Sequence, residues 1–208
     1  MNDPALTVRA IRAVAVEVPL RFVLGTSAAA VRAAPLLLVD VDTEEGVTGR
    51  TYLFCYVSAA APAIVSLLGA VEAAVKGQRV VPGELWAQLA KRFRLIGVQG
   101  IVRMAMSAVD TACWDALAIA ANVPLVEYLG GTRRSIPAYN SCGLGLMPAA
   151  ALAGEAEQLL EGGFRAVKLR LGYPTLDEDI AALHAVKQRV PADVKIMVDF
   201  NQALAVAE

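Results

Sequence analysis

The sequence has 208 residues, enough for one large domain or two small ones with a hydrophobic core. Hydrophobic residues make up 57% and charged residues 19%, a composition that excludes an intrinsically disordered chain. The formal net charge of −1 creates no overall field that attracts nucleic acid or an anionic membrane, so we expect neither as a partner.

Two stretches bear on localisation. Residues 1–4 lack the basic and apolar stretches of a signal peptide, and the three cysteines are odd in number and widely spaced, so we expect a cytoplasmic protein. The run from Thr51 to Val71 is uncharged and long enough to span a membrane. However, Pro62 and Gly69 interrupt it, and it resembles a strand end followed by an alanine-rich helix. We therefore expect no membrane span.

The first quarter of the sequence predicts β structure. Valines alternate with small or charged residues over 14–18, as in a half-buried strand. Further strands are expected at 36–39 and 47–54, and the turn residues at 42–46 would join them as a hairpin in a small antiparallel sheet. Residues 21–34, rich in Ala, Gly and Ser, are expected to form a flexible segment between strands.

Residues 59–130 predict helices. Apolar side chains recur at helical spacing after Pro62, around Trp86 to Phe93, and from about Ile101 to Ala121, where Ile101, Met104 and Ala105 would share the buried face. Pro124 and a Gly-Gly pair then interrupt the pattern. We place a domain boundary there, which gives an N-terminal domain at 1–134 and a second domain at 135–208.

The second domain alternates strands and helices. Strands are expected at 136–141, 166–170 and 196–199, with helices at 148–161 and after a capping box that begins at Thr175. Alternating β and α units imply parallel strands, in either a doubly wound sheet or a (β/α)₈ barrel.

Polar side chains end two of these strands. Lys168 and Arg170 would share one strand face, and so would Asp199 and Asn201, because side chains at i and i+2 point the same way. Such groups converge at the C-terminal ends of barrel strands, where these folds keep their active sites. Two cations suit an anionic group, Lys168 suits a base, and Asp199 suits Mg²⁺. The alternative is that they are solvated strand ends paired as salt bridges.

The segments Phe164–Pro174 and Ile196–Gln202 resemble the mandelate racemase / muconate lactonizing enzyme group of the enolase superfamily, and mandelate racemase most of all. The runs at 91–93, 101–105 and 110–117 are similar as well. The resemblance covers nearly the whole sequence. It implies an N-terminal α+β capping domain followed by a (β/α)₈ TIM-type barrel, of which only the first strands and helices are present in this chain.

The resemblance also implies an activity. It is removal of the proton α to the carboxylate of a small hydroxy acid or sugar acid through an enediolate, with Mg²⁺ as cofactor, by an enzyme that is a homo-oligomer in its full-length form. Asp199 matches a metal ligand, and Lys168 matches a lysine that contacts the substrate carboxylate. Ser141 and Asn201 match substrate contacts, and Tyr52 lies in a segment that matches a loop closing over the substrate.

Arg170 is the main departure from the family pattern. It stands where the family has a second catalytic lysine, which acts as a base. An arginine pKa of about 12.5 or higher rules out ordinary base chemistry, and a racemase needs bases on both faces of its substrate. An isomerase of the racemase type therefore competes with a lyase, a sugar-acid dehydratase that uses a single base, in which Arg170 orients a carboxylate.

The histidine that would act on the opposite face is also missing. His184, the one histidine of the sequence, lies mid-helix and is expected outside the barrel. Because the other metal ligands and a His–Asp pair are not among these residues, a further alternative is an inactive fragment. Schiff-base formation by Lys168 in an aldolase-like barrel is possible, but it leaves Asp199 and Asn201 without a role.

Overall fold

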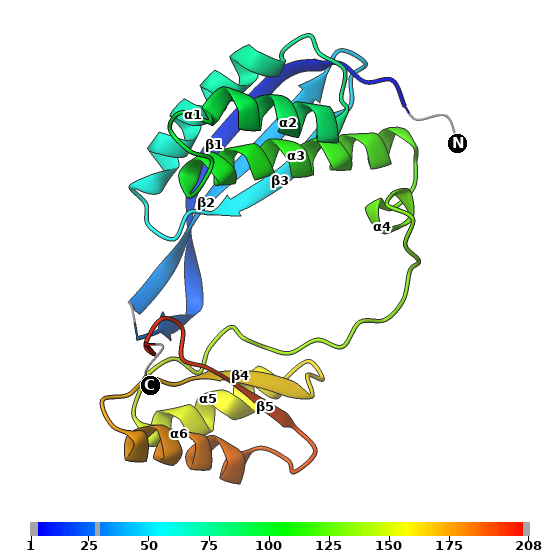
Figure 1. Ribbon diagram of the computed structural model, residues 1–208. Coiled ribbons are helices and arrows are strands. Elements are labelled where there is room, and N and C mark those ends of the chain that lie inside the picture. Colours follow the sequence, from blue (N-terminus) through cyan, green and yellow to red (C-terminus); the bar gives the residue numbers. More distant parts are fainter. Residues whose placement is uncertain (1–3, 28–29, 206–208) are drawn as a thin grey trace. The chain divides into compact units, whose positions relative to one another are not determined.

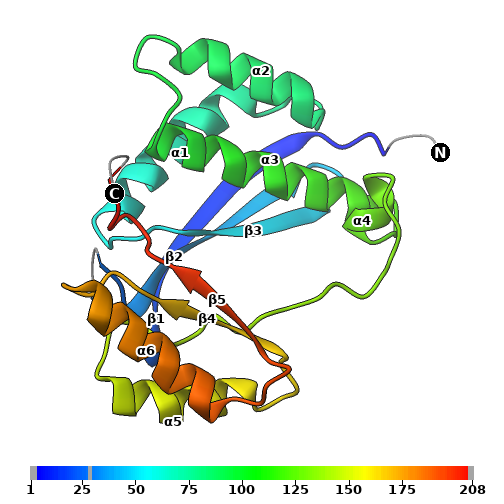
Figure 2. The same cartoon turned by 60° about the horizontal axis from the view of Figure 1, so that its bottom comes forward.

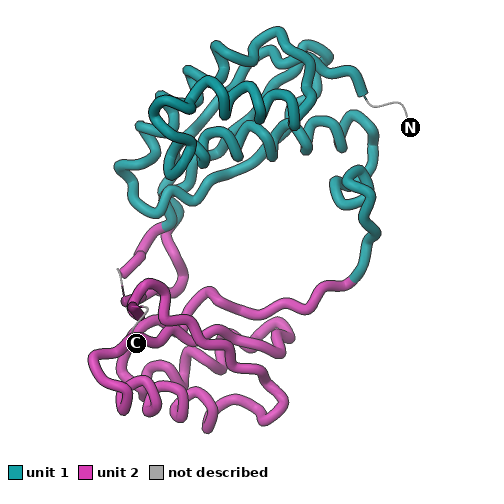
Figure 3. The backbone as a smooth tube through the Cα atoms, in the orientation of Figure 1, with its two compact units in different colours: residues 1–18, 34–134 teal, residues 19–33, 135–208 magenta. Residues whose placement is uncertain are grey.

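The computed structural model describes residues 4–27 and 30–205, so residues 1–3, on which part of the signal-peptide argument rests, lie outside the described part. The chain forms two compact units (Figure 3). The first unit comprises Met1–Val18 and Ala34–Arg134, and the second Pro19–Ala33 and Ser135–Glu208. The segment at 19–33, expected in the first domain, thus groups with the second unit. The division into a capping and a catalytic domain stays a prediction.

Three strands form the sheet of the first unit, in the order β1 (Val8–Gly25), β2 (Ala30–Thr43) and β3 (Thr48–Phe54). β2 and β3 pair antiparallel, which confirms the predicted hairpin between them. The prediction of a flexible segment at 21–34 was wrong. Its described residues lie largely in β1 and β2, which are hydrogen-bonded neighbours in the sheet, since small residues do not prevent such pairing; residues 28 and 29 lie outside the described part.

Helices cover one face of this sheet (Figure 1). The three predicted helices are confirmed as α1 (Ala60–Val75), α2 (Pro82–Phe93) and α3 (Ile101–Ala120). A short helix that the sequence did not reveal, α4 (Leu125–Tyr128), follows Pro124. Within the described residues, no helix combines the length and apolar character needed to cross a membrane.

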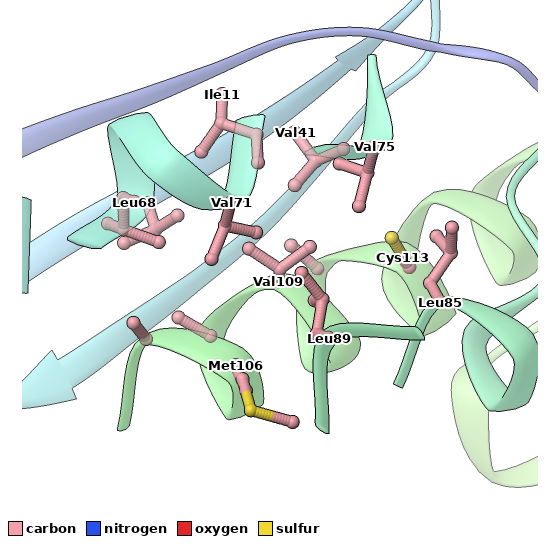
Figure 4. Packing of buried hydrophobic residues seen from close by; sticks show 14 of the residues in the cluster. Ile11, Val41, Leu68, Val71, Val75, Leu85, Leu89, Met106, Val109 and Cys113 are labelled. Atoms are coloured by element: carbon pink, nitrogen blue, oxygen red, sulfur yellow. The ribbon is translucent and has the colours of Figure 1, made fainter. Parts of the chain in front are cut away.

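The core of the first unit lies between the sheet and the helices. Val41 of β2, Val71 of α1, Leu89 of α2 and Val109 of α3 point toward one another and are almost fully buried (Figure 4). The predicted buried face of α3 was partly wrong, because Ile101 is 39% exposed. The helix approaches β3 so closely that only the small residues on its neighbouring face fit against the strand.

The second unit is built from α5 (Ala149–Leu160), β4 (Ala166–Arg170), α6 (Leu176–Arg189) and β5 (Lys195–Asp199). The strands are parallel, as expected, and α5 and α6 pack side by side (Figure 2). Both helices bury apolar side chains in one cluster with Val167 and Leu169 of β4. These two residues alternate along the strand with the polar Lys168 and Arg170.

A signal between neighbouring residues sets the start of α6, whereas the structure of the segment before α5 depends on a pairing partner far away in the sequence. The predicted capping box of Thr175 and Glu178 is present. The predicted strand at 136–141 was wrong. Only Asn140 forms a bridge, to Val167 in β4, partly because Pro137 in the preceding stretch has no N–H to offer a ladder.

Candidate functional site

An ion pair joins the ends of the two parallel strands. The strand register places Arg170 opposite Asp199, and the Lys168 ammonium donates from Nζ to Asp199 Oδ2 at 2.8 Å. The side chains of Lys168 and Asp199 are 20% and 31% exposed, so solvent and small solutes reach both. The structure therefore brings together the two residues on which the predicted chemistry depends most.

Asp199 is held in its ionised form. The hydrogen bond from Lys168 is the main cause that lowers the pKa of Asp199, and the Asn201 backbone N–H, which donates to Oδ1 at 2.7 Å, lowers it further. The charge of Arg170 acts in the same direction. At neutral pH this carboxylate is an oxygen-donor group beside two cations.

Asn201 does not continue the strand. β5 ends at Asp199, and Asn201 lies in a turn with φ 52°, a left-handed conformation that asparagine tolerates better than most residues. The expectation that Asp199 and Asn201 share a strand face was therefore wrong. What links the two residues is the backbone hydrogen bond described above. The contact of Asn201 with substrate stays a prediction.

Arg170 is buried, with 4% of its surface exposed, and its guanidinium donates to backbone carbonyls. One nitrogen donates to Gly143 O at 2.5 Å, and the other to Ser141 O at 3.0 Å. Burial lowers the pKa of Arg170 from its ordinary value. All the same, a guanidinium whose hydrogen bonds are all donated has no lone pair with which to accept a proton.

The two remaining predicted substrate contacts lie in different surroundings. Ser141 follows Asn140 in an irregular segment rather than at a strand end, and its hydroxyl lies 3.4 Å from the Arg170 guanidinium. Tyr52 belongs to β3 of the first unit, opposite Leu38, and is 65% exposed. Substrate binding by either side chain stays a prediction.

Sequence reasoning missed several residues that hold the site together. Gly143 and Gly145 do not have a positive φ; each instead permits a close approach, Gly143 to Glu155 and Gly145 to Gly25. Asp179 is buried and accepts hydrogen bonds from the backbone N–H groups of the loop after β4. The glycine spacing was a usable signal. Glu155 and Asp179 gave none, because only the folded chain brings them to their partners.

Asp199 fits a hard divalent cation as one ligand. Each of its oxygens accepts one hydrogen bond, which leaves lone pairs free, and carboxylate oxygens are the ligands that Mg²⁺ prefers. Across residues 4–27 and 30–205, no three His, Cys, Asp or Glu side chains gather as a metal site would require. The described residues therefore offer Asp199 as one candidate ligand for such a site.

Fold and strand arrangement together fit an α+β unit followed by the first βα units of a barrel. Comparison with protein families makes this specific. Residues 8–130 match the mandelate racemase / muconate lactonizing enzyme N-terminal domain, and residues 151–208 match the enolase C-terminal domain-like family. The chain belongs to the mandelate racemase / muconate lactonizing enzyme family of the enolase superfamily.

Individual relatives agree with this assignment. The chain is 33% identical, over 80% of its length and 46% of the relative's, to 3,6-anhydro-alpha-L-galactonate cycloisomerase of Streptomyces coelicolor. An enolase structure from an alpha proteobacterium, BAL199, with bound magnesium is 41% identical, with a TM-score of 0.92 over 97% of this chain and 57% of that one. A Bradyrhizobium enolase with magnesium and mandelic acid is 36% identical, with a TM-score of 0.90 over 99% and 56%.

The relatives catalyse several different reactions and are longer than this chain. Other curated relatives are sugar-acid dehydratases, cycloisomerases and epimerases, and several homologous structures contain magnesium. The chain spans about half the length of the curated relatives it matches along most of its residues. The comparisons confirm the predicted family, the predicted fold and membership of a magnesium-dependent superfamily.

Proposed function

We propose that the protein containing this chain removes the proton α to the carboxylate of a sugar acid with a single base, and so acts as a Mg²⁺-dependent dehydratase or cycloisomerase. The observation that carries the proposal is the Lys168–Asp199 ion pair next to a buried arginine, at the C-terminal ends of two parallel strands. A carboxylate and two cations at this position suit a reaction in which negative charge grows on a substrate carboxylate.

Asp199 would hold magnesium, through lone pairs that its hydrogen bonds leave free. Magnesium, when bound, would supply positive charge that stabilises the substrate carboxylate as its α-proton leaves. Lys168 would add a second positive charge from the protein. Its ammonium already lies 2.8 Å from one carboxylate oxygen and is partly exposed, so it can also donate to a carboxylate of the substrate.

Arg170 argues for chemistry at one face of the substrate. Its guanidinium donates to two backbone carbonyls and has no lone pair for a proton, so it cannot replace a lysine base. His184 is exposed on α6 and is not proposed as the opposite base. One-base elimination needs only a single proton-accepting group, whereas racemisation needs two.

The names of the relatives support a sugar-acid substrate, since a cycloisomerase of an anhydro-galactonate and several sugar-acid dehydratases are among them. A second candidate is a small hydroxy acid of the mandelate type, turned over by a racemase-like reaction. The Bradyrhizobium neighbour that binds mandelic acid favours it. Arg170 weighs against its two-base form.

The test is a substrate panel. The natural gene product is incubated with MgCl₂ and aldonic acids, aldaric acids or mandelate, and the α-proton is followed by NMR. We expect one sugar acid to lose it, with kcat/KM falling about 100-fold in Lys168→Met and in Asp199→Asn. Lys195→Met and Asp193→Asn, at the exposed opposite end of the strands, are the matched controls. Full activity in the site variants, or undiminished turnover after chelation of Mg²⁺, would contradict the proposal.

A further inference from the structure

The segment at 140–146 is held from several sides by residues far away in the sequence. Arg170 binds it twice through the guanidinium, at Ser141 O and Gly143 O, and a third time through its backbone N–H, which donates to Leu144 O at 2.9 Å. Asn140, at the start, pairs with β4 through both its N–H and its carbonyl. One arginine thus binds three successive parts of the same segment.

Leu144 shows how tightly the segment is fixed. It is fully buried with φ 52°, a left-handed conformation that costs a leucine roughly 1–2 kcal/mol. Both of its backbone polar groups are bonded, the carbonyl to Arg170 and the N–H to Glu155 Oε1 at 2.6 Å. The strained conformation persists because its surroundings determine it.

The far end of the segment is joined to the β1–β2 hairpin within the same unit. Leu146 N–H donates to Gly25 O at 3.0 Å. A side chain on Gly145 would lie 2.4 Å from Gly25 N, so two glycine backbones touch. Fixing the segment therefore also fixes the place where this hairpin docks.

Ser141 brings a hydroxyl group to this segment. A guanidinium only donates hydrogen bonds, so any contact between it and Ser141 Oγ, here 3.4 Å long, uses a lone pair of the hydroxyl oxygen. The hydroxyl hydrogen then remains available to donate to another acceptor. An anionic oxygen is the acceptor that such a group binds most strongly.

We propose that Arg170 is a positioning residue. It fixes the segment at 140–146 and orients the Ser141 hydroxyl as a hydrogen-bond donor to the anionic group of the substrate, an inference that rests on the proposed function for the nature of that group. Lysine would not replace it, because an ammonium is compact and cannot span two carbonyls as the planar guanidinium does. A side chain that the family pattern makes a base thus acts here through its neighbours.

The first arm of the test needs no ligand. Amide hydrogen exchange at Leu144 is compared between the natural gene product, Arg170→Lys, and the control Arg165→Lys, which makes the same change in an exposed ion pair with Asp193 just before β4. We expect exchange about 10-fold faster in Arg170→Lys and unchanged in the control. Equal rates in all three proteins would overturn the positioning role.

The second arm measures mandelate binding in the presence of MgCl₂ by calorimetry. Arg170→Lys and Ser141→Ala should each weaken binding about 10-fold, and the double variant should be no weaker than either, because both changes remove the same interaction. Additive losses, or unchanged binding in Arg170→Lys, would overturn the proposal. If the unchanged protein does not bind mandelate, the hydroxy-acid form of the proposed function fails, and the exchange arm alone decides the role of Arg170.

Discussion

The contact between β3 and α3 depends on one glycine. A methyl group placed on Gly49 would lie 1.8 Å from Ala112 O and 2.8 Å from Ala116 N, both of which belong to the helix backbone. No side-chain rotation can relieve such a contact. The Gly49→Ala substitution therefore tests whether the first unit packs as described.

The size of the effect can be worked from these distances. An ordinary contact of about 3.5 Å requires a movement of roughly 1.7 Å, which would separate α3 from the sheet along their contact. Overpacking a core costs about 1–3 kcal/mol, and because the obstacle is backbone we expect about 3 kcal/mol or more. The matched control is Gly69→Ala, exposed in the middle of α1 with open space around it, which should stabilise by about 0.5–1 kcal/mol.

Urea unfolding of the 208-residue chain, followed by circular dichroism, measures both variants against the unchanged protein. Gly49→Ala should lower the midpoint strongly, whereas Gly69→Ala should raise it slightly. Equal midpoints for the two variants would refute the close approach of α3 to β3.

Three further predictions concern carboxylates and the metal. Asp179→Ala should cost about 1–3 kcal/mol in urea unfolding, since it leaves two N–H groups of the loop after β4 without their acceptor, while Asp177→Ala, exposed in the same helical turn, should cost less. Hydrogen bonds accepted from Arg12 and Lys168 are the main cause of the lowered pKa values of Asp42 and Asp199. The two carboxylates therefore stabilise the fold above pH of about 4, and this contribution is lost as the pH falls further. A urea unfolding midpoint that does not fall as the pH is lowered below about 4 would contradict this. Magnesium titration of the 208-residue chain should show weak binding, and tight stoichiometric binding would contradict a site with one described ligand.

Local patterns in the sequence were enough to predict much of the fold. Short apolar runs identified β4 and β5, and the capping box at Thr175 gave the start of α6, because these signals act between neighbours in the chain. The predictions for the segments at 136–141 and 21–34 were wrong because they depend on interactions between residues that are far apart in the chain. Whether they form strands depends on pairing partners that composition does not reveal.

The candidate site also has a part that the sequence predicts and a part that it does not. That Lys168 and Asp199 meet could be predicted from parallel strands with polar ends. The acceptors of Arg170 could not be predicted, because they are backbone carbonyls 27 and 29 residues away in an irregular segment. The sequence could show that Arg170 is not a base, but only the structure shows what it binds.

The central claim, one-base removal of an α-proton, is tested most directly by stereochemistry in deuterated water. A single enantiomer of the acid that the protein turns over is incubated with MgCl₂, and product, unreacted substrate and deuterium content are analysed by NMR and chiral chromatography. Because Arg170 offers no second base, we predict that the substrate loses its α-proton as product forms. The unreacted substrate should keep its original configuration. Accumulation of the opposite α-configuration carrying deuterium would contradict the account.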